Sequence, residues 1–205
     1  HVVLAPGDVS LMQISAFNPN VIFCQDLNVY NQRVRKQLHE DYYLAGQLSC
    51  AWPGDHVVED YDILFTSFPH YLSRIHDLGV KAVFLPLAFD PEVHHRLLAA
   101  GAKQGERNFD VSFVGGMSRQ FGSRARNLEW IANRLADFKL KGHFFGYGNP
   151  TYNIDSYWGL PMYQVYGQSK IVLNIHHPAA EGYSNNLRMF EATGMGALLL
   201  TEASP

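Results

Sequence analysis

The sequence predicts an α/β protein made of two lobes, each built around a parallel sheet. Short apolar runs alternate along the chain with stretches of helical periodicity, which is the strand–helix–strand pattern of doubly wound sheets. Most of these runs are continuously apolar, as expected of strands buried on both faces. Hydrophobic residues make up 47% of the 205 and charged residues only 17%, so the chain is not a disordered segment.

Eight apolar runs are the predicted strands, in chain order 20–25, 47–52, 62–67, 81–87, 110–115, 143–147, 170–176 and 197–201. Between them, helical patterns cover residues 8–17 and 123–138, and the second carries an apolar stripe at helical spacing. Two further helices are predicted to start at Pro69 and Pro91, the latter with Asp90 as N-cap, because proline is favoured at the first helical position.

The polar, glycine-containing residues 98–108 indicate a helix end followed by a linker, with four strands on either side. We therefore expect two Rossmann-like lobes, residues 1–98 and residues 99–205. More strands usually precede this point in such a lobe, so the first lobe is predicted to be incomplete. The chain begins at His1 without an initiator Met or signal peptide, which suggests a piece of a longer protein.

Charge, hydropathy and cysteine content limit the partners and the compartment. The formal net charge is −3 with the 10 His neutral, so no basic surface points to nucleic acid or an anionic membrane. No apolar run approaches the ~20 residues that span a bilayer. Cys24 and Cys50 each lie in an apolar run, which favours two reduced cysteines and a cytoplasmic protein over a disulfide.

Ligands of open α/β sheets bind beyond the carboxyl ends of the strands, and two exits in the second half contain glycines. The first is Gly115-Gly116 with Ser118 and Arg119. The glycines admit close backbone approach, the serine can cap a helix and the arginine can reach a phosphate; a plain tight turn is the alternative. The second exit, Gly146-Tyr147, either lines a cleft or leads into an irregular stretch.

The third exit follows the strand that ends near His176, which either contacts a ligand or is a structural histidine. A helix is predicted to begin at Ser184 or Asn185 as N-cap, to turn Leu187 and Phe190 inward, and to end at Gly194.

That helix carries three polar residues around its first turns, Asn186, Arg188 and Glu191. A glutamate on a helix usually faces solvent, but Phe190 and Gly194 around Glu191 favour partial burial. We interpret the three as ligand-binding residues, with a structural hydrogen-bonding role as the alternative.

Residues 169–202, SKIVLNIHHPAAEGYSNNLRMFEATGMGALLLTE, resemble the donor-binding segment of GT-B glycosyltransferases. The likeness is greatest to the group-1-like branch typified by the spore-maturation CgeB-type proteins. Their pattern there is Asn-x-Arg-x-Phe-Glu, then glycine and an apolar strand ending in threonine, and the residues that match are Asn186, Arg188, Phe190 and Glu191. Residues 61–91 resemble the end of the N-terminal lobe of that branch.

The resemblance implies a GT-B fold and transfer of a sugar from a nucleotide-sugar donor to an acceptor, with no cofactor. In related families two glutamates with seven residues between them face the donor, whereas nine residues separate Glu181 from Glu191. The resemblance therefore assigns only Glu191, as the residue that holds the donor ribose. The first lobe would be the acceptor side, and the acceptor could be a saccharide, a protein or a small molecule.

Transfer expels a nucleoside diphosphate, so negative charge grows on the leaving phosphates. A helix N-terminus, the N–H groups of a glycine loop and a guanidinium stabilise such charge without a divalent metal. Arg188 or Arg119 would meet the diphosphate. No catalytic base is identified: Asp26 and Asp90 follow strands of the first lobe, and helix-capping or loop roles suit them better.

Competing functions are less well supported. A non-catalytic nucleotide- or sugar-binding module within a larger protein is the main alternative, and an oxidoreductase is disfavoured because G-x-G-x-x-G is absent. The D-x-D string at residues 60–62, which holds a metal in the other main glycosyltransferase fold, precedes a strand and is interpreted as structural. Adjacent histidines, His94-His95 and His176-His177, cannot easily share one ion, so no metal site is predicted.

Overall fold

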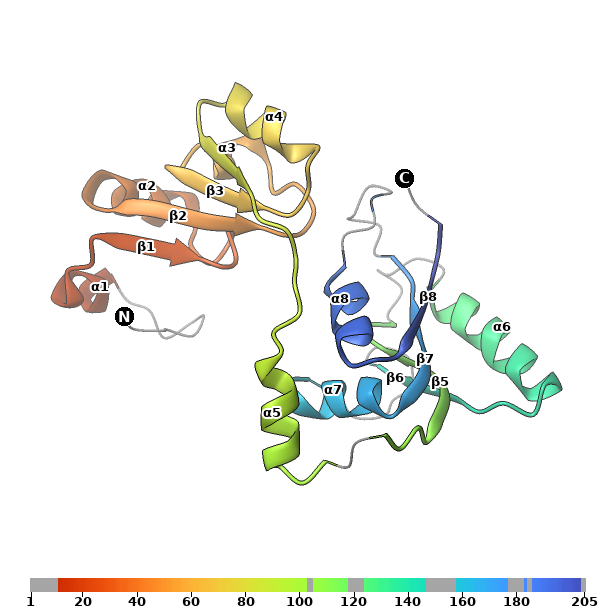
Figure 1. Ribbon diagram of the computed structural model, residues 1–205. Coiled ribbons are helices and arrows are strands. Elements are labelled where there is room, and N and C mark those ends of the chain that lie inside the picture. Colours follow the sequence, from red (N-terminus) through yellow and green to blue (C-terminus); the bar gives the residue numbers. More distant parts are fainter. Residues whose placement is uncertain are drawn as a thin grey trace. The chain divides into compact units, whose positions relative to one another are not determined.

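The computed structural model describes residues 11–102, 105–117, 124–146, 158–176, 183 and 186–203. The chain forms two compact units, His1–Pro86 and Leu87–Pro205. Each unit contains a four-stranded parallel sheet, as Figure 1 shows. The predicted α/β fold with two parallel sheets is confirmed.

The first unit has the strand order β1-β2-β3-β4, so the sheet grows in one direction along the chain. A right-handed crossover between each pair of strands places all the connecting helices on the same face of such a sheet. The elements are α1 (Leu11–Phe17), β1 (Val21–Cys24), α2 (Gln32–Asp41), β2 (Tyr43–Leu48), α3 (Asp55–Val58), β3 (Ile63–Thr66), α4 (Tyr71–Asp77) and β4 (Lys81–Phe84).

The two faces of this first sheet differ sharply in burial. On one face Leu44 and Leu64 are fully buried beneath the helices. On the other face Val21 and Phe23 remain 53% and 55% exposed, and Val83 is exposed as well. The Phe23 and Phe65 rings approach each other on this open face, with centroids 6.3 Å apart.

The second unit has the order β6-β5-β7-β8, which reverses direction at β5. The chain moves from β5 to β6 on one side and then crosses back to β7, so its helices cover both faces; α6 lies on one side and α7 and α8 on the other (Figure 1). The elements are α5 (Glu92–Ala99), β5 (Phe109–Val114), α6 (Arg124–Asp137), β6 (Gly142–Phe145), α7 (Leu160–Gly167), β7 (Ser169–Asn174), α8 (Leu187–Gly194) and β8 (Leu198–Thr201).

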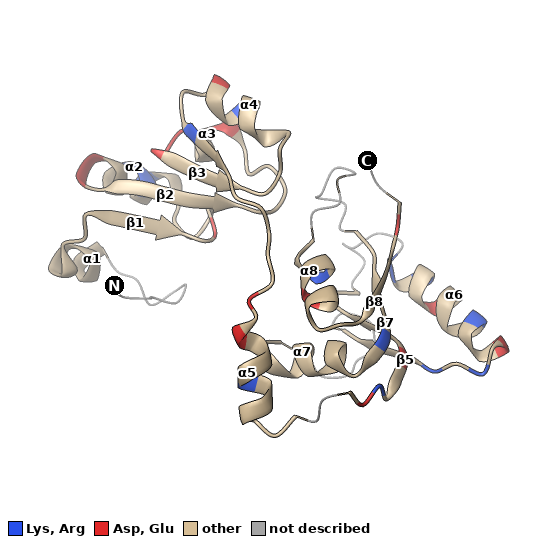
Figure 2. Ribbon diagram, in the orientation of Figure 1, with Lys and Arg blue, Asp and Glu red and all other residues tan. Residues whose placement is uncertain are grey.

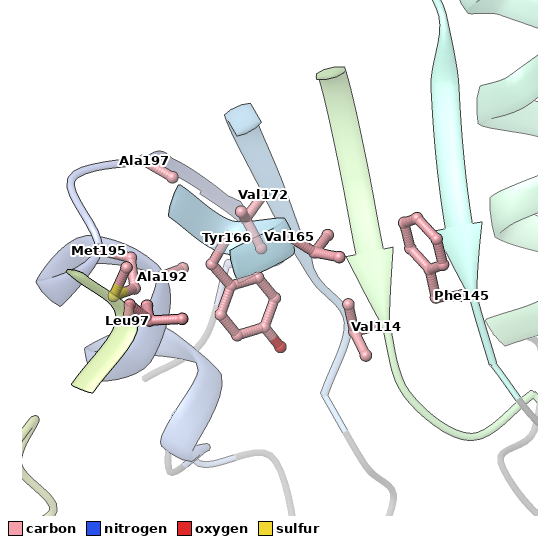
Figure 3. Packing of buried hydrophobic residues seen from close by; sticks show 9 residues of the cluster. All are labelled: Leu97, Val114, Phe145, Val165, Tyr166, Val172, Ala192, Met195 and Ala197. Carbon is pink, nitrogen blue, oxygen red and sulfur yellow. The ribbon is translucent and has the colours of Figure 1, made fainter. Parts of the chain in front are cut away.

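Each face of this second sheet carries its own apolar core. Under α6, Leu128 packs with Phe113 and Phe144. Under α5, α7 and α8 lies a second cluster that includes Val172, Tyr166 and others shown in Figure 3. The central strands β5 and β7 are therefore buried on both sides, which agrees with their apolar sequences, whereas Leu198 and Leu200 of the edge strand β8 are exposed.

The predicted boundary after residue 98 differs from the division after Pro86. Helix α5 packs against α7: Leu97 joins the core of the second unit, and His94 Nε2 lies 2.8 Å from the Gly194 carbonyl oxygen. Because these contacts all lie within residues 87–205, α5 is part of the second unit. The helix begins at Glu92 with Pro91 as N-cap, one residue later than predicted, although the Asp90 carboxylate accepts a hydrogen bond from the Glu92 N–H at 2.9 Å.

One predicted strand is misplaced and three helices, α2, α3 and α7, were not predicted. The run 47–52 was expected to be a strand, but β2 occupies Tyr43–Leu48. Gly46 weakens the apolar pattern there, yet a Cβ at this position would lie 2.4 Å from Leu27 Cδ2, so packing excludes a larger residue. Helix α3 has only four residues, and α7 has no apolar stripe set against a polar face. Helix α2 is amphipathic, with Leu38 buried, but this pattern was not recognised as a helix.

Candidate functional site

The carboxyl ends of β5 and β7 mark the point where the strand order of the second unit reverses. Open α/β sheets bind ligands at such a point, because loops to opposite faces separate there and leave a crevice. The predicted exits at Gly115-Gly116 and His176 follow these two neighbouring strands. The topology therefore brings two of the three predicted loop regions to one edge of one sheet.

Arg188 is the most buried charged residue of α8, with 8% of its surface exposed. Its Nη1 donates to Asn174 Oδ1 at 3.0 Å and its Nη2 donates to the Val114 carbonyl oxygen at 2.6 Å. The guanidinium carbon lies 4.6 Å from the centre of the Phe113 ring. The guanidinium thus joins the first turn of α8 to the ends of both β5 and β7.

Glu191 lies one turn further along α8, which carries both signs of charge (Figure 2). Its Oε1 accepts a hydrogen bond from the Tyr163 hydroxyl at 3.0 Å. Burial raises the pKa of Glu191, while the Tyr163 hydrogen bond and the charge of Arg188 oppose that rise. Burial and the neighbouring carboxylate raise the pKa of Tyr163 to about 12, so the hydroxyl stays protonated as the donor.

The glycines at the strand exits are explained by packing between the loops. A Cβ on Gly115 would lie 2.6 Å from Arg188 Nη2, so this position must be small for the guanidinium to reach β5. A Cβ on Gly146 would lie 2.3 Å from the Gly115 carbonyl oxygen. The Gly115 N–H donates to the Phe145 carbonyl at 2.9 Å, so the exits of β5 and β6 are in direct contact.

His176 follows β7 and is held by the end of β8. Its backbone N–H donates to Glu202 Oε2 at 2.8 Å, and its Nε2 lies 3.4 Å from Thr201 Oγ1. Asn174 Nδ2 donates to the same threonine oxygen at 3.0 Å. Through Asn174, this hydrogen-bonded chain connects His176 to Arg188.

Arg124 is a buried residue of this region that the sequence reasoning did not single out. It is the first residue of α6 and only 4% exposed. Its Nη1 donates to the Gly116 carbonyl and its Nη2 to the Ile175 carbonyl, both at 2.9 Å. Nothing in its sequence neighbourhood marks it, because Arg126 stands two positions away in a similar setting.

The predicted phase of α8 is wrong. Leu187 and Phe190 were expected to point inward, yet they are 50% and 37% exposed, whereas Arg188 and Ala192 are buried. The helix is rotated because the paired guanidinium satisfies its hydrogen bonds inside the edge of the sheet. The N-cap is Asn186, whose side chain accepts from the Arg188 N–H at 3.0 Å.

Five of the predicted site residues lie outside the described part of the chain: Ser118, Arg119, Tyr147, Ser184 and Asn185. The described ones all belong to the second unit: Gly115, Gly116, Gly146, His176, Asn186, Arg188 and Glu191.

A cavity of about 240 Å³ in the second unit lies away from this edge of the sheet. Leu97, Met195 and Arg107 are among its lining residues. The Arg107 guanidinium donates to the carbonyl oxygens of Gly167 and Gly196, at 2.8 Å each. Since these carbonyls end α7 and follow α8, Arg107 stabilises two helix C-termini, and we assign the cavity no role in the site.

In the first unit the D-x-D string is engaged in structural contacts. Asp60 pairs with the buried Arg35 at 3.0 Å, and Asp62 Oδ2 accepts from the Leu44 N–H at 2.7 Å. These contacts agree with the structural interpretation of the string. Among the described residues, no cluster of three or more His, Cys, Asp or Glu could hold a metal.

A cavity of about 180 Å³ in the first unit opens at the carboxyl ends of β1 and β2. It is lined by polar groups that include Gln25, Asp26 and Gln47 and by the exposed Cys50. The Asp26 carboxylate accepts from the Asn28 N–H at 2.9 Å, which is a local turn contact. The cavity therefore lies where a ligand of an α/β lobe is expected.

Comparisons with known proteins bear on the fold and on part of the second unit. The glycosyl transferase-like family model matches residues 119–205. This segment is therefore similar to glycosyl transferase-like domains. It includes α6 through β8, with Arg124, Arg188 and Glu191, but not the Gly115-Gly116 turn. A comparison with curated proteins finds no match.

Solved structures with the same fold include two transferases. The pneumococcal O-GlcNAc transferase GtfA, crystallised with UDP and GlcNAc, is 13% identical, with a TM-score of 0.61, over 95% of this chain and 44% of its own. An α,α-trehalose 6-phosphate synthase of Burkholderia multivorans is 12% identical, with a TM-score of 0.63. The match covers 93% of this chain and 59% of the synthase.

A putative UDP-N-acetylglucosamine 2-epimerase of Listeria monocytogenes also shares the fold, at 11% identity and a TM-score of 0.56, over 93% of this chain and 59% of its own. The chain therefore matches GT-B proteins over part of their length, between 44% and 59% in these three. Identities this low show the fold alone. Among the described helices, none has the length and hydropathy to span a membrane.

Proposed function

We propose that the protein is a glycosyltransferase that moves a sugar from a nucleotide-sugar donor to an acceptor without a divalent metal. The observation that carries this proposal is the buried Arg188 and the half-buried Glu191 on α8, at the reversal point of a sheet in the segment that matches the glycosyl transferase-like family. The partial matches to GT-B transferases, one of them crystallised with UDP, support it.

In the proposed reaction the bond from the anomeric carbon to the β-phosphate oxygen breaks while a bond from the acceptor to that carbon forms. The bonding electrons leave with the nucleoside diphosphate, whose negative charge therefore increases. Arg188 and Arg124 add positive charge around the exits of β5 and β7. Such fixed charges and oriented N–H groups stabilise the leaving group without reorganisation.

Glu191 is proposed to hold the ribose of the donor. Its Oε1 is fixed by the Tyr163 hydroxyl, while its Oε2 accepts no hydrogen bond from the residues described. An ionised carboxylate accepts hydrogen bonds only, which suits the two adjacent hydroxyl groups of a ribose. Bonds of this charge-assisted kind contribute ~1.5–3 kcal/mol each.

The first unit is proposed as the acceptor side. Its polar cavity at the ends of β1 and β2 offers the amides of Gln25 and Gln47 and the carboxylate of Asp26. Amides and carboxylates recognise hydroxyl groups through directional hydrogen bonds. We therefore favour a hydroxyl-bearing acceptor, such as a saccharide.

A cytoplasmic location is proposed as well. Cys24 and Cys50 are both free thiols in the structure. Cytosolic proteins keep their thiols reduced, whereas secreted proteins of modest size often rely on disulfides.

The alternative function is a non-catalytic nucleotide- or sugar-binding module. It is kept because Arg188 and Glu191 are assigned to donor binding, whereas no described residue is assigned as a catalytic base. Release of UDP from UDP-sugars, measured with candidate saccharide acceptors, distinguishes the two, because a binding module retains the donor intact.

Calorimetric titration with UDP tests the donor site that both functions share. We expect the wild-type protein to bind UDP and Glu191→Gln to bind it about 10–100-fold more weakly, the equivalent of ~1.5–3 kcal/mol. Glu129→Gln, an exposed glutamate on α6, is the matched control and should bind like wild type. Equal affinity of wild type and Glu191→Gln would remove Glu191 from the site.

A further inference from the structure

Arg124 and Arg188 together hold the backbone on both sides of the Gly115-Gly116 turn. Arg188 binds the Val114 carbonyl, which precedes the turn, and Arg124 binds the Gly116 carbonyl. Both guanidinium carbons lie near the Phe113 ring, at 4.6 Å for Arg188 and 5.6 Å for Arg124. Two buried cations therefore hold carbonyls of this segment, in addition to the hydrogen bond from the Gly115 N–H to the Phe145 carbonyl.

Fixing a carbonyl also fixes the N–H of the next residue. In a trans peptide the C=O and the following N–H point in opposite directions, and the described chain contains no cis peptide. Because the Gly116 carbonyl points at Arg124, the Met117 N–H points away from it. No described residue accepts a hydrogen bond from this N–H or from that of Gly116.

The second carbonyl bound by Arg124 shows what such an oriented amide can bind. Arg124 holds the Ile175 carbonyl, so the His176 N–H points away from the guanidinium. That N–H donates to the Glu202 carboxylate at 2.8 Å. One of the two amides oriented by Arg124 thus already binds an anionic oxygen.

We propose that Arg124 is a positioning residue of the donor site, which aims the Met117 N–H at a phosphate oxygen of the nucleoside diphosphate. The inference rests on the proposed function. Arg124 itself does not touch the ligand, because its terminal nitrogens donate to Gly116 and Ile175. Its planar fork reaches both carbonyls at once, which the single ammonium of lysine cannot do.

The test compares UDP with uridine, which lacks the diphosphate. We expect Arg124→Lys to bind UDP at least tenfold more weakly than wild type, while its affinity for uridine stays within twofold. The matched control is Arg134→Lys, at the exposed far end of the same helix, and it should change neither affinity. A merely structural role of Arg124 would lower both affinities together, and this result would overturn the proposal.

Selective ¹⁵N labelling of methionine reads the amide directly, since the chain has 5 Met. We expect UDP to shift the Met117 amide resonance of the wild-type protein, assigned with Met117→Leu, and uridine to leave it in place. Because this measurement is made on the wild-type protein, it does not depend on whether an Arg124 variant folds. UDP binding without a shift of Met117 overturns the positioning role alone, whereas absence of UDP binding by wild type overturns the proposed function and this inference with it.

Discussion

At the scale of single residues, the site depends on charges that the fold buries and pairs. Arg188 is buried because Asn174 and the Val114 carbonyl satisfy its terminal nitrogens, and a buried cation without such partners would be costly. Glu191 is stabilised less completely, since burial raises its pKa despite Tyr163 and Arg188. A ligand that donates hydrogen bonds to Glu191 would therefore stabilise the charged form of this carboxylate.

The raised pKa of Glu191 predicts a pH dependence of stability. In the unfolded chain a glutamate titrates near 4.5, so above that pH the folded protein retains the Glu191 proton longer than the unfolded one. The contribution of Glu191 to the free energy of unfolding therefore falls as the pH rises from 4.5 through its folded pKa, and is constant beyond it. Glu191→Gln removes this contribution.

Urea denaturation of both proteins from pH 4 to 8 measures the effect. The difference in the free energy of unfolding, wild type minus Glu191→Gln, should decrease with pH and then level off. A difference that increases with pH would mean that the pKa is lowered in the folded state.

At the scale of elements, α8 is positioned by its N-cap and by its buried arginine. Asn186 has extended backbone angles and its side chain accepts the Arg188 N–H. Asn186, the N-cap of α8, thus binds Arg188, the residue that fastens this helix to the sheet. Loss of the cap should loosen the turn that presents Arg188.

Asn186→Ala is therefore expected to lower the free energy of unfolding by ~0.5–2 kcal/mol. Asn186→Asp keeps a side-chain acceptor and should stay close to wild type, which makes it the matched control. Urea denaturation followed by circular dichroism gives both values. Equal loss in the two variants would show that the cap hydrogen bond is not what stabilises the helix.

The sequence predicted most strands well because short apolar runs mark them in both sheets, although only the central strands of the second sheet are buried on both faces. It misplaced β2, where Gly46 interrupts the run for a packing reason that only the neighbouring strands reveal. It predicted Arg188 and Glu191 as polar residues at a strand exit. It did not predict the phase of α8, since in the sequence a buried arginine that is hydrogen-bonded to Asn174 and a carbonyl looks like a solvated one. Arg124 could not be found, because its partners are backbone carbonyls 8 and 51 residues away.

At the scale of the whole molecule, strand order explains why the two sheets differ. The reversal at β5 gives the second sheet helices on both faces and a crevice between their loops. The first sheet has no reversal among its described strands, and several apolar residues on one of its faces remain exposed. The clearest examples are Val21, Phe23 and Val83.

The open face predicts opposite effects of substitution on the two sides of one sheet. Phe23, which is 55% exposed, should tolerate Phe23→Lys with a change in the free energy of unfolding within ~0.5 kcal/mol, typical of surface positions. Leu64 is fully buried on the other face, and Leu64→Ala should cost ~2–5 kcal/mol because it leaves a cavity. Since exposed apolar patches promote association, Phe23→Lys should also reduce self-association in light scattering. A large loss of stability in Phe23→Lys would mean that this face is packed in solution.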